Sequence, residues 1–317
     1  MTGIATHGAG YWPPGGRTTH LVSQVMRDRQ GTLRLGQASF APRQLVVMAI
    51  VNRTPDSFYR PGATWDESAA MDRVHQAVAE GADIVDIGGV PAAPGADVDP
   101  AEEIRRTASF IAAVRAAHPG VVISVDTWRH ETARAACAAG ADLINDSWGG
   151  RDRRLGEVAA EFGAGLVCAH AGKQAPRTRP FRVSYPDVMV DVLDQTLTLA
   201  ARAVADGVDP SRIVIDAAHD FGKNTWHSLE VTRRLPEMVA TGWPVLVAVS
   251  NKDFIGETLD LPVAERLAGT LATTSVCAWL GARIFRAHHV AETRQALDMV
   301  SAIRGDSPPA RAVRGLA

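Results

Sequence analysis

Short apolar segments recur along this chain, and longer amphipathic segments separate them. About eight of the apolar or β-branched runs have the length of buried strands: residues 45–51, 84–85, 121–125, 143–144, 166–169, 213–215, 245–249 and 284–285. The intervening segments place apolar residues at helical spacing, as in Ala70, Val74, Ala77 and Val78. A repeated alternation of strand and helix predicts an α/β fold with a parallel sheet.

Helix capping signals support the same division. Asp99, Pro100 and Glu102 supply an N-cap, a proline at the first helical position and an acidic first turn. Thr64 stands three residues before Glu67, which is the spacing of a capping box. Glycine precedes four of the predicted strands, as expected where the residue after a helix adopts positive φ: Gly81, Gly140, Gly163 and Gly281. These glycines predict short loops from a helix into the next strand.

Each predicted strand is followed by a polar side chain that would be costly to bury without a partner. These residues are Asn52, Asp86, Asp126, Asn145 with Asp146, His170, Asp216, Ser250 and Arg286. In a (β/α)8 barrel the carboxyl ends of the strands converge on one face, where the site is built. Asp and Asn also cap helices and begin turns, which is the alternative explanation for any one of them. Because the pattern recurs at all eight strands, it predicts a TIM barrel with a convergent polar site.

The 317-residue chain is long enough for one large barrel or for two ordinary domains. Residues 1–18 are rich in Gly and Pro, and residues 304–317 contain prolines and are mildly basic. We therefore expect a flexible N-terminal segment over 1–18, a barrel domain over 19–303 and a flexible tail over 304–317.

Composition and charge exclude several classes of protein. With 46% hydrophobic and 21% charged residues the chain has the composition of a soluble globular protein. Its formal net charge of −2 provides no electrostatic footprint for a nucleic acid. No segment has the length and apolarity of a membrane span, and no signal peptide is visible. The three cysteines lack paired spacing, so we expect reduced thiols in a cytoplasmic protein.

The strand-end residues indicate a class of ligand. The carboxylates of Asp86, Asp126 and Asp216, with Asn145, offer acceptors to a flat heterocycle whose edge carries N–H donors. On the same rim, Arg286 and His288 can face one way and donate to an anion, and Lys252 can add a second positive charge: these three follow the last two strands. A base-like ring that carries a phosphate is therefore the expected ligand.

A phosphate-bearing ligand suits Mg²⁺, a hard cation that one or two oxygen ligands can hold. No zinc-binding spacing accompanies the histidines. The sequence also has neither a GxxxxGK[ST] loop nor a G-x-S-x-G elbow, which argues against a P-loop enzyme and an α/β-hydrolase.

Seven motifs occur in the order in which they occur in dihydropteroate synthases. They are IVNRTPDSF at 50–58, GADIVDIGG at 81–89, PGA at 94–96, SVDT at 124–127, IND at 144–146, FGK at 221–223 and SNK at 250–252. Several motifs in a fixed order are far more specific than any one, and the match spans roughly residues 44–303. The chain resembles this family, which implies a TIM barrel of the pterin-binding type and a homodimer formed through its last helices.

That family joins 6-hydroxymethyl-7,8-dihydropterin diphosphate to p-aminobenzoate and releases pyrophosphate. No protein nucleophile is needed, because neutralising the charge on the leaving diphosphate leaves an electrophilic pterin methylene for the arylamine. The resemblance implies a set of substrate-binding residues: Asp126, Asn145, Asp216, Ser250, Lys252 and Arg286. It also implies a catalytic set in which Asn52 is the Mg²⁺ ligand near the diphosphate: Asn52, Lys252, Arg286 and His288.

The loops depart from the family pattern. After Gly88-Gly89 the family reads Glu-Ser-Thr-Arg, whereas residues 90–93 here read Val-Pro-Ala-Ala, so the threonine that touches the diphosphate and the loop arginine are replaced. Arg60-Pro61 replaces an Asp-Gly pair in the first loop, and Asn251 replaces an arginine near the p-aminobenzoate carboxylate. Each lost charge-assisted contact weakens binding by about 1.5–3 kcal/mol.

Three functions are consistent with this pattern. The first is a dihydropteroate synthase, an alkyl/aryl-transferase of folate biosynthesis. The second is a paralogue that keeps the pterin pocket but is inactive in, or diverted from, that reaction. The third is a barrel that transfers methyl groups from a folate to a corrinoid. The deep heterocycle pocket is nearly intact while the loops above it are rewritten, so the expected ligands are a pterin diphosphate and, if the second site survives, p-aminobenzoate.

Overall fold

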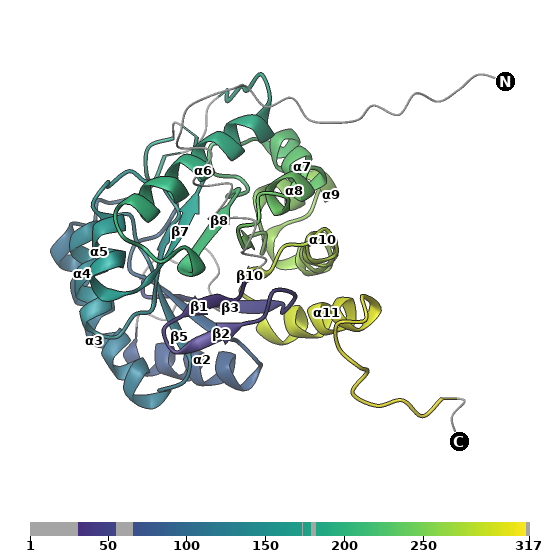
Figure 1. Ribbon diagram of the computed structural model, residues 1–317, viewed down its shortest axis with the longest axis horizontal. Coiled ribbons are helices and arrows are strands. Elements are labelled where there is room, and N and C mark those ends of the chain that lie inside the picture. Colours follow the sequence, from purple (N-terminus) through teal and green to yellow (C-terminus); the bar gives the residue numbers. More distant parts are fainter. Residues whose placement is uncertain (1–30, 55–65, 173, 179–181, 315–317) are drawn as a thin grey trace.

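The computed structural model describes residues 31–54, 66–172, 174–178 and 182–314. Eight parallel strands close into a barrel in the order β10-β3-β4-β5-β6-β7-β8-β9, with helices packed around the outside (Figure 1). The strands are β3 Val46–Asn52, β4 Ile84–Gly88, β5 Val122–Asp126, β6 Leu143–Asp146, β7 Gly165–Ala169, β8 Ile213–Asp216, β9 Val245–Val247 and β10 Ile284–Ala287. The predicted (β/α)8 TIM barrel is confirmed, and each predicted strand overlaps one of these.

Helices connect successive strands. They are α2 Glu67–Ala79, α3 Pro100–Ala117, α4 His130–Ala138, α5 Leu155–Phe162, α6 Val188–Ala205, α7 Thr225–Arg233, α8 Leu235–Val239, α9 Asp253–Leu259, α10 Leu267–Trp279 and α11 Val290–Ile303, with short 3-10 helices η2 Pro210–Arg212 and η3 Val263–Glu265. Asp99 caps α3 as predicted, because its carboxylate accepts from the Glu102 N–H at 2.8 Å. All four predicted helix-terminal glycines have positive φ.

The start of α2 differs from the predicted capping box. Asp66 is the N-cap, and its carboxylate accepts from the backbone N–H groups of Ser68 and Ala69. The predicted cap, Thr64, lies outside the described residues. A carboxylate one residue before the helix satisfies two N–H groups of the first turn, so it takes the role that the spacing assigned to Thr64.

A hairpin that the sequence analysis did not predict lies at the amino-terminal ends of the strands. It consists of β1 Leu33–Leu35 and β2 Ala38–Phe40, which pair antiparallel (Figure 1). Its buried side chains join one core cluster with the barrel-interior residues of the strand starts, among them Val46, Ile84 and Leu143. The turn residue Gly36 has a φ of 55°, and a Cβ there would lie 2.2 Å from the Asp142 carboxylate. The hairpin therefore closes one end of the barrel.

The strands alternate between two cores. Side chains such as Val47, Ala49 and Val51 point outward and pack under the helices, whereas Val46 and Met48 point into the barrel. With the amino-terminal end closed, the carboxyl-terminal end of the strands is where a ligand can enter.

The chain ends are only partly described. Helix α11 ends at Ile303, and Arg304 still donates to the Ala278 carbonyl at 3.0 Å. An ion pair joins Asp306 to Arg43. Residues 1–18 lie outside the described part of the chain, and the flexibility of both ends stays a prediction. Among the described helices, none combines the length and the apolar character needed to cross a bilayer.

Candidate functional site

A cavity of about 510 Å³ opens at the carboxyl-terminal ends of the strands. Its lining includes all eight site residues that the sequence analysis selected: Asn52, Asp126, Asn145, Asp216, Ser250, Lys252, Arg286 and His288. They come from or directly follow six different strands, so the barrel itself brings them together. The roles assigned to them by resemblance stay predictions at this point.

The Arg286 guanidinium is fixed by two carboxylates. Its Nε lies 2.6 Å from the Asp86 Oδ2, and its Nη2 lies 2.8 Å from the Asp126 Oδ2. Burial alone would lower the pKa of Arg286, but Asp86 and Asp126 outweigh burial and raise it. The planar group is therefore held charged and in one orientation beside the cavity.

Two buried carboxylates face the cavity. Burial raises the pKa of Asp216 to about 6, although the Ala218 N–H donates to its Oδ1 at 2.7 Å. Burial likewise raises the pKa of Asp126 to about 6 against the opposing effect of Arg286. The Asp126 side chain keeps 24% exposure because it borders the cavity. Ligand N–H donors would replace the missing water around both carboxylates and stabilise their charged forms.

Asn145 lines the cavity and also contacts Asp86, a carboxylate buried behind the lining. One N–H of its side-chain amide donates to the Asp86 Oδ2 at 3.1 Å, so the carbonyl oxygen and the second N–H are the groups it can offer a ligand. Asp86 is fully buried beneath Arg286 and is not part of the lining. It orients two cavity residues instead of binding the heterocycle, so its expected role as a ligand acceptor is wrong.

The polar residues that follow the eight strands were all predicted to converge on the site, and besides Asp86 two of them lie elsewhere: Asp146 and His170. Asp146 is adjacent to Asn145 and points to the other face of the sheet, where it accepts from the Trp148 and Gly150 N–H groups. His170 is fully buried and belongs to a separate cluster described below. Both side chains form hydrogen bonds to groups behind the cavity wall, and neither lines the cavity.

Ser250 and His288 form a pair on the cavity wall. The Ser250 Oγ lies 2.9 Å from the His288 Nδ1 and accepts from the His288 backbone N–H at 3.1 Å. Burial and the nearby Arg286 lower the pKa of His288 to about 3. The imidazole is therefore neutral at physiological pH and is not a cation for an anionic ligand.

Lys252 lies over an aromatic ring. Its Nζ is 4.3 Å from the centre of the Phe221 ring. Burial lowers the pKa of Lys252, and the Asp220 carboxylate opposes this effect. Asp220 itself caps the start of α9 by accepting from the Asp253 and Phe254 N–H groups. Lys252 is thus a partly compensated cation next to the two cavity carboxylates.

One buried cluster was missed by sequence reasoning. The Lys223 Nζ lies 2.6 Å from the His170 Nδ1, and the His170 Nε2 lies 2.7 Å from the Asp191 carboxylate. The Lys223 Nζ also donates to the carbonyls of Ala218 and Phe221, two residues of the cavity wall. The FGK motif and the strand-end position of His170 were the available signals, but only the fold joins them.

Residues 48–288 match the family described as "Pterin binding enzyme", which is most of the chain and contains all eight site residues. The chain belongs to this family. The dihydropteroate synthase resemblance is confirmed, and the relatives below show that the chain is a divergent paralogue.

The curated relatives include proteins named as inactive synthases and proteins named as synthases. The "Inactive dihydropteroate synthase 2" of Mycobacterium tuberculosis is 59% identical over 276 residues, 86% of this chain and 87% of that protein. The "Dihydropteroate synthase" of Bacillus subtilis is 37% identical over 260 residues, 81% of this chain and 88% of that protein.

Solved structures of the family agree with the fold. The Yersinia pestis dihydropteroate synthase in complex with a sulfonamide drug aligns with a TM-score of 0.81 at 30% identity, over 87% of this chain and 100% of that one. The dihydropteroate synthase of Coxiella burnetii in complex with pteroic acid aligns with a TM-score of 0.78 at 30% identity, over 87% of this chain and 99% of that one.

Asn52 is the residue at which a Mg²⁺ ion would bind in this cavity. Gly88 has no side chain between Asn52 and Asp126: a Cβ there would lie 3.7 Å from the Asn52 Oδ1 and 4.0 Å from the Asp126 Oδ2. The Asp126 Oδ2 is already paired with Arg286. Asn52 therefore fits as a single oxygen ligand, which suits a Mg²⁺ ion that a diphosphate carries in with it.

Two of the loop departures, residues 90–93 and Asn251, belong to the cavity lining. Residues 90–93, the Val-Pro-Ala-Ala segment that follows β4, line the cavity without a polar side chain. The other altered loop, with Arg60 and Pro61, lies outside the described residues.

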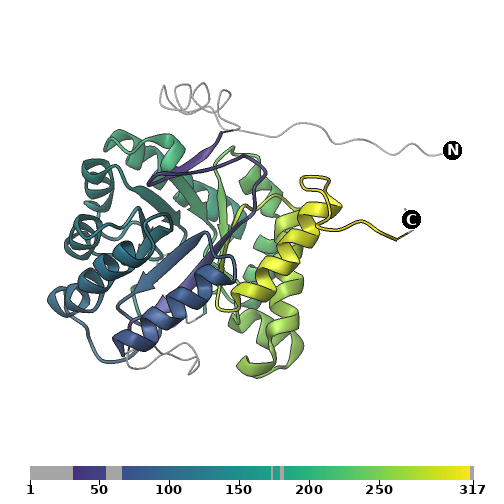
Figure 2. The same cartoon turned by 90° about the horizontal axis from the view of Figure 1, so that it is seen from below.

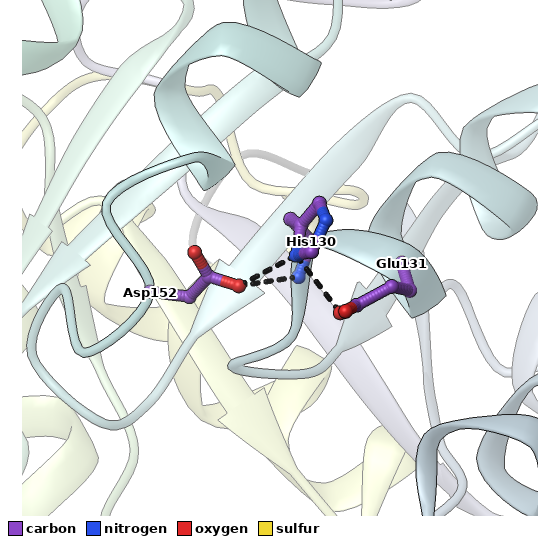
Figure 3. A group of neighbouring side chains, drawn as sticks. All are labelled: His130, Glu131 and Asp152. Carbon is purple, nitrogen blue, oxygen red and sulfur yellow. Dashed lines mark hydrogen bonds and ion pairs between the residues drawn. The ribbon is translucent and has the colours of Figure 1, made fainter.

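A cluster of ionisable side chains joins the first turn of α4 to the loop between β6 and α5 (Figure 3). The His130 Nδ1 lies 2.8 Å from a Glu131 carboxylate oxygen and 2.7 Å from the Asp152 Oδ2. Asp152 also accepts from the His130 backbone N–H, and its hydrogen bonds from Arg154 and His130 outweigh burial and lower its pKa to about 2. The contacts tie the loop after β6 to the start of α4, near Trp128 on the cavity lining.

Proposed function

We propose that this protein binds a reduced pterin in the cavity and no longer makes dihydropteroate at an appreciable rate. The observation that carries the proposal is a division within one cavity. Carboxylate, amide and guanidinium groups surround its depth, whereas residues 90–93 at its rim have apolar side chains.

The depth of the cavity suits a pterin edge. Asp126 and Asp216 can each accept N–H bonds from the amino-pyrimidine part of the ring, and Asn145 supplies a carbonyl acceptor. Lys252 can donate to a ring acceptor, and the flat guanidinium of Arg286 can stack on the ring. The pteroic acid complex of the Coxiella burnetii relative supports a ligand of this kind.

The cavity offers fewer groups for the transfer reaction than for binding of the pterin ring. Loss of the diphosphate requires groups that stabilise its developing charge. Arg286 already serves two carboxylates, and His288 is neutral. The 59% identity to a protein named inactive supports the same conclusion. We accordingly classify the chain as a transferase-family protein with a pterin site and without effective transferase activity.

Three further features belong to the proposal. Mg²⁺ would bind through Asn52 only together with a diphosphate. Helices α10 and α11 pack side by side (Figure 2). They carry exposed apolar side chains that suit a homodimer contact: Val276, Trp279, Met299 and Ile303. The three cysteines are buried free thiols, as suits a protein of the cytoplasm.

The test combines calorimetry with a product assay. Titration with 6-hydroxymethyl-7,8-dihydropterin should give saturable binding. Incubation with its diphosphate, Mg²⁺ and p-aminobenzoate should yield dihydropteroate at least about 100-fold more slowly than the Bacillus subtilis enzyme, because two lost charged contacts remove about 3 kcal/mol or more. Turnover within tenfold of that enzyme would establish a working synthase, and the absence of pterin binding would refute the proposal.

A repair variant sharpens the assay. Replacing residues 90–93 by the family's Glu-Ser-Thr-Arg should raise product formation at least tenfold if the rim accounts for the loss. The matched control replaces the same four residues by Gly-Ser-Ser-Gly, which restores polarity and flexibility without the charged groups, and should have no such effect.

A further inference from the structure

The mouth of the cavity is apolar and aromatic. Residues 90–94 read Val-Pro-Ala-Ala-Pro and form one side of it. On another side, Trp128 and Trp148 lie edge to face with their ring centres 6.1 Å apart, and Trp148 meets Phe221 at 4.8 Å in the same manner. All three rings belong to the lining. The three rings therefore form one contiguous aromatic part of the lining, and Lys252 lies over the Phe221 ring.

Arg177 holds the apolar segment 90–94 in place, because its guanidinium donates to backbone carbonyls in and next to that segment. The Arg177 Nε donates to the Ala93 carbonyl at 3.2 Å, and its Nη1 donates to the Ala96 carbonyl. A second guanidinium near the mouth, that of Arg129, lies over the Trp128 ring and forms an ion pair with Glu103 at 2.6 Å. Both guanidinium groups therefore stabilise the cavity walls, and the contacts described here are to protein groups and not to the space where a ligand would lie.

The charge of the lining opposes a polyanion. Among its described residues are four carboxylates and two cationic side chains: Asp126, Asp216, Asp220 and Asp253 against Lys252 and Arg286. Arg286 is shared between Asp86 and Asp126, so it adds little positive potential at the mouth. Asp253 is exposed and paired with Arg266 at 3.0 Å, so the enclosed carboxylates outnumber the cations of the lining by one. In a site removed from bulk water, this excess negative charge raises the free energy of a bound diphosphate.

We propose, building on the pterin binding proposed above, that the mouth selects pterins whose substituent at C6 is uncharged and aromatic and discriminates against pterin diphosphates. The heterocycle reaches the same deep carboxylates in both cases. An aryl group at C6 would lie between the apolar segment and the tryptophans, where its burial is favourable. A diphosphate in the same place would meet no charged donor from residues 90–94.

The test compares three probes by isothermal titration in buffer that contains Mg²⁺: 6-hydroxymethylpterin, its diphosphate and 6-(anilinomethyl)pterin. The anilinomethyl compound should bind at least tenfold more tightly than the hydroxymethyl compound, and the diphosphate should bind no more tightly than the hydroxymethyl compound. A diphosphate that binds tenfold more tightly than both would overturn the selectivity while leaving pterin binding intact. If none of the three binds, the proposed function falls, and the selectivity with it.

Variants of the mouth give an independent readout. Trp128→Ala should lower the affinity for the anilinomethyl compound about tenfold and leave that for the hydroxymethyl compound within twofold. Trp226→Ala is the matched control, because Trp226 is 78% exposed on α7 and is not part of the lining. Equal losses for both compounds in the Trp128 variant would contradict the aromatic contact.

Charge at the rim can be tested at Ala92, an exposed lining residue. Ala92→Arg should increase the affinity for the diphosphate about 10- to 100-fold, the range of one charge-assisted contact. Ala92→Gln, of similar length and without charge, should leave it unchanged. A diphosphate affinity that does not respond to the arginine would show that charge at the mouth is not what excludes this ligand.

Discussion

The replacement of Asp216 by Asn separates the binding role of this carboxylate from any structural role. Asp216 is 6% exposed, lines the cavity and accepts one N–H bond, from Ala218 at 2.7 Å. Asn keeps an acceptor for that bond and nearly the same volume, but it loses the negative charge and one acceptor. A contact in which the carboxylate accepts N–H donors is worth about 1.5–3 kcal/mol, so pterin affinity should fall about 10- to 150-fold.

Folding stability should respond in the opposite direction. Burial raises the pKa of Asp216 from 3.8 to about 6, so the folded state holds its proton more tightly than the unfolded state. The stability that this carboxyl contributes is therefore complete below pH 3.8 and is lost as pH rises through 6. At pH 7 the penalty is on the order of 3 kcal/mol, because each tenfold change in proton affinity corresponds to about 1.4 kcal/mol. Removing the charge should leave the melting temperature unchanged or raise it by several degrees.

Calorimetric titration with 6-hydroxymethyl-7,8-dihydropterin and thermal unfolding at pH 7 measure the two effects. Asp194→Asn is the matched control, since Asp194 is exposed on α6 and outside the cavity lining. A drop of more than about 5 °C in the melting temperature with unchanged affinity would mean that Asp216 is architectural and that the reasoning is wrong.

The other predictions concern protonation, the metal, assembly and the barrel floor. Because Asp126 and Asp216 have raised pKa values of about 6 and bind N–H donors in their charged forms, pterin affinity should be constant above pH 7 and fall up to tenfold per pH unit for each carboxylate below pH 6, in titrations from pH 5 to 8. Chelation of Mg²⁺ should weaken binding of the pterin diphosphate without affecting the hydroxymethyl compound, and equal effects on both would contradict a metal carried by the diphosphate. Trp279→Glu should convert a dimer to a monomer in light scattering, whereas a wild-type monomer would refute the assembly. Leu35→Ala should destabilise the fold by about 2–5 kcal/mol in urea titration, because Leu35 is fully buried in the hairpin that closes the barrel.

Local pattern was sufficient for the barrel strands of this protein and insufficient for the hairpin. Apolar runs of strand length and helical spacing between them identified all eight barrel strands, because burial on both faces of a parallel strand leaves a continuous apolar signature. Glycines with positive φ marked the loops, since other residues rarely adopt that conformation. The hairpin escaped notice although the LRL and ASF segments flank a two-residue turn, because each strand is only three residues long.

The sequence predicted most residues of the candidate site, but not the hydrogen bonds and ion pairs among them. Strand-end position is a property of the sequence, and six of the nine residues that it selected line one cavity. Lys252 and His288, each two residues further along the chain, line the same cavity. Facing direction and partner choice are not local properties: Asn145 borders the cavity while its neighbour Asp146 points away from it. The decisive contact joins Arg286 to Asp86, 200 positions apart in the sequence. Only closure of the barrel brings these side chains within 2.6 Å, and only burial there decides which of the neighbouring groups are charged.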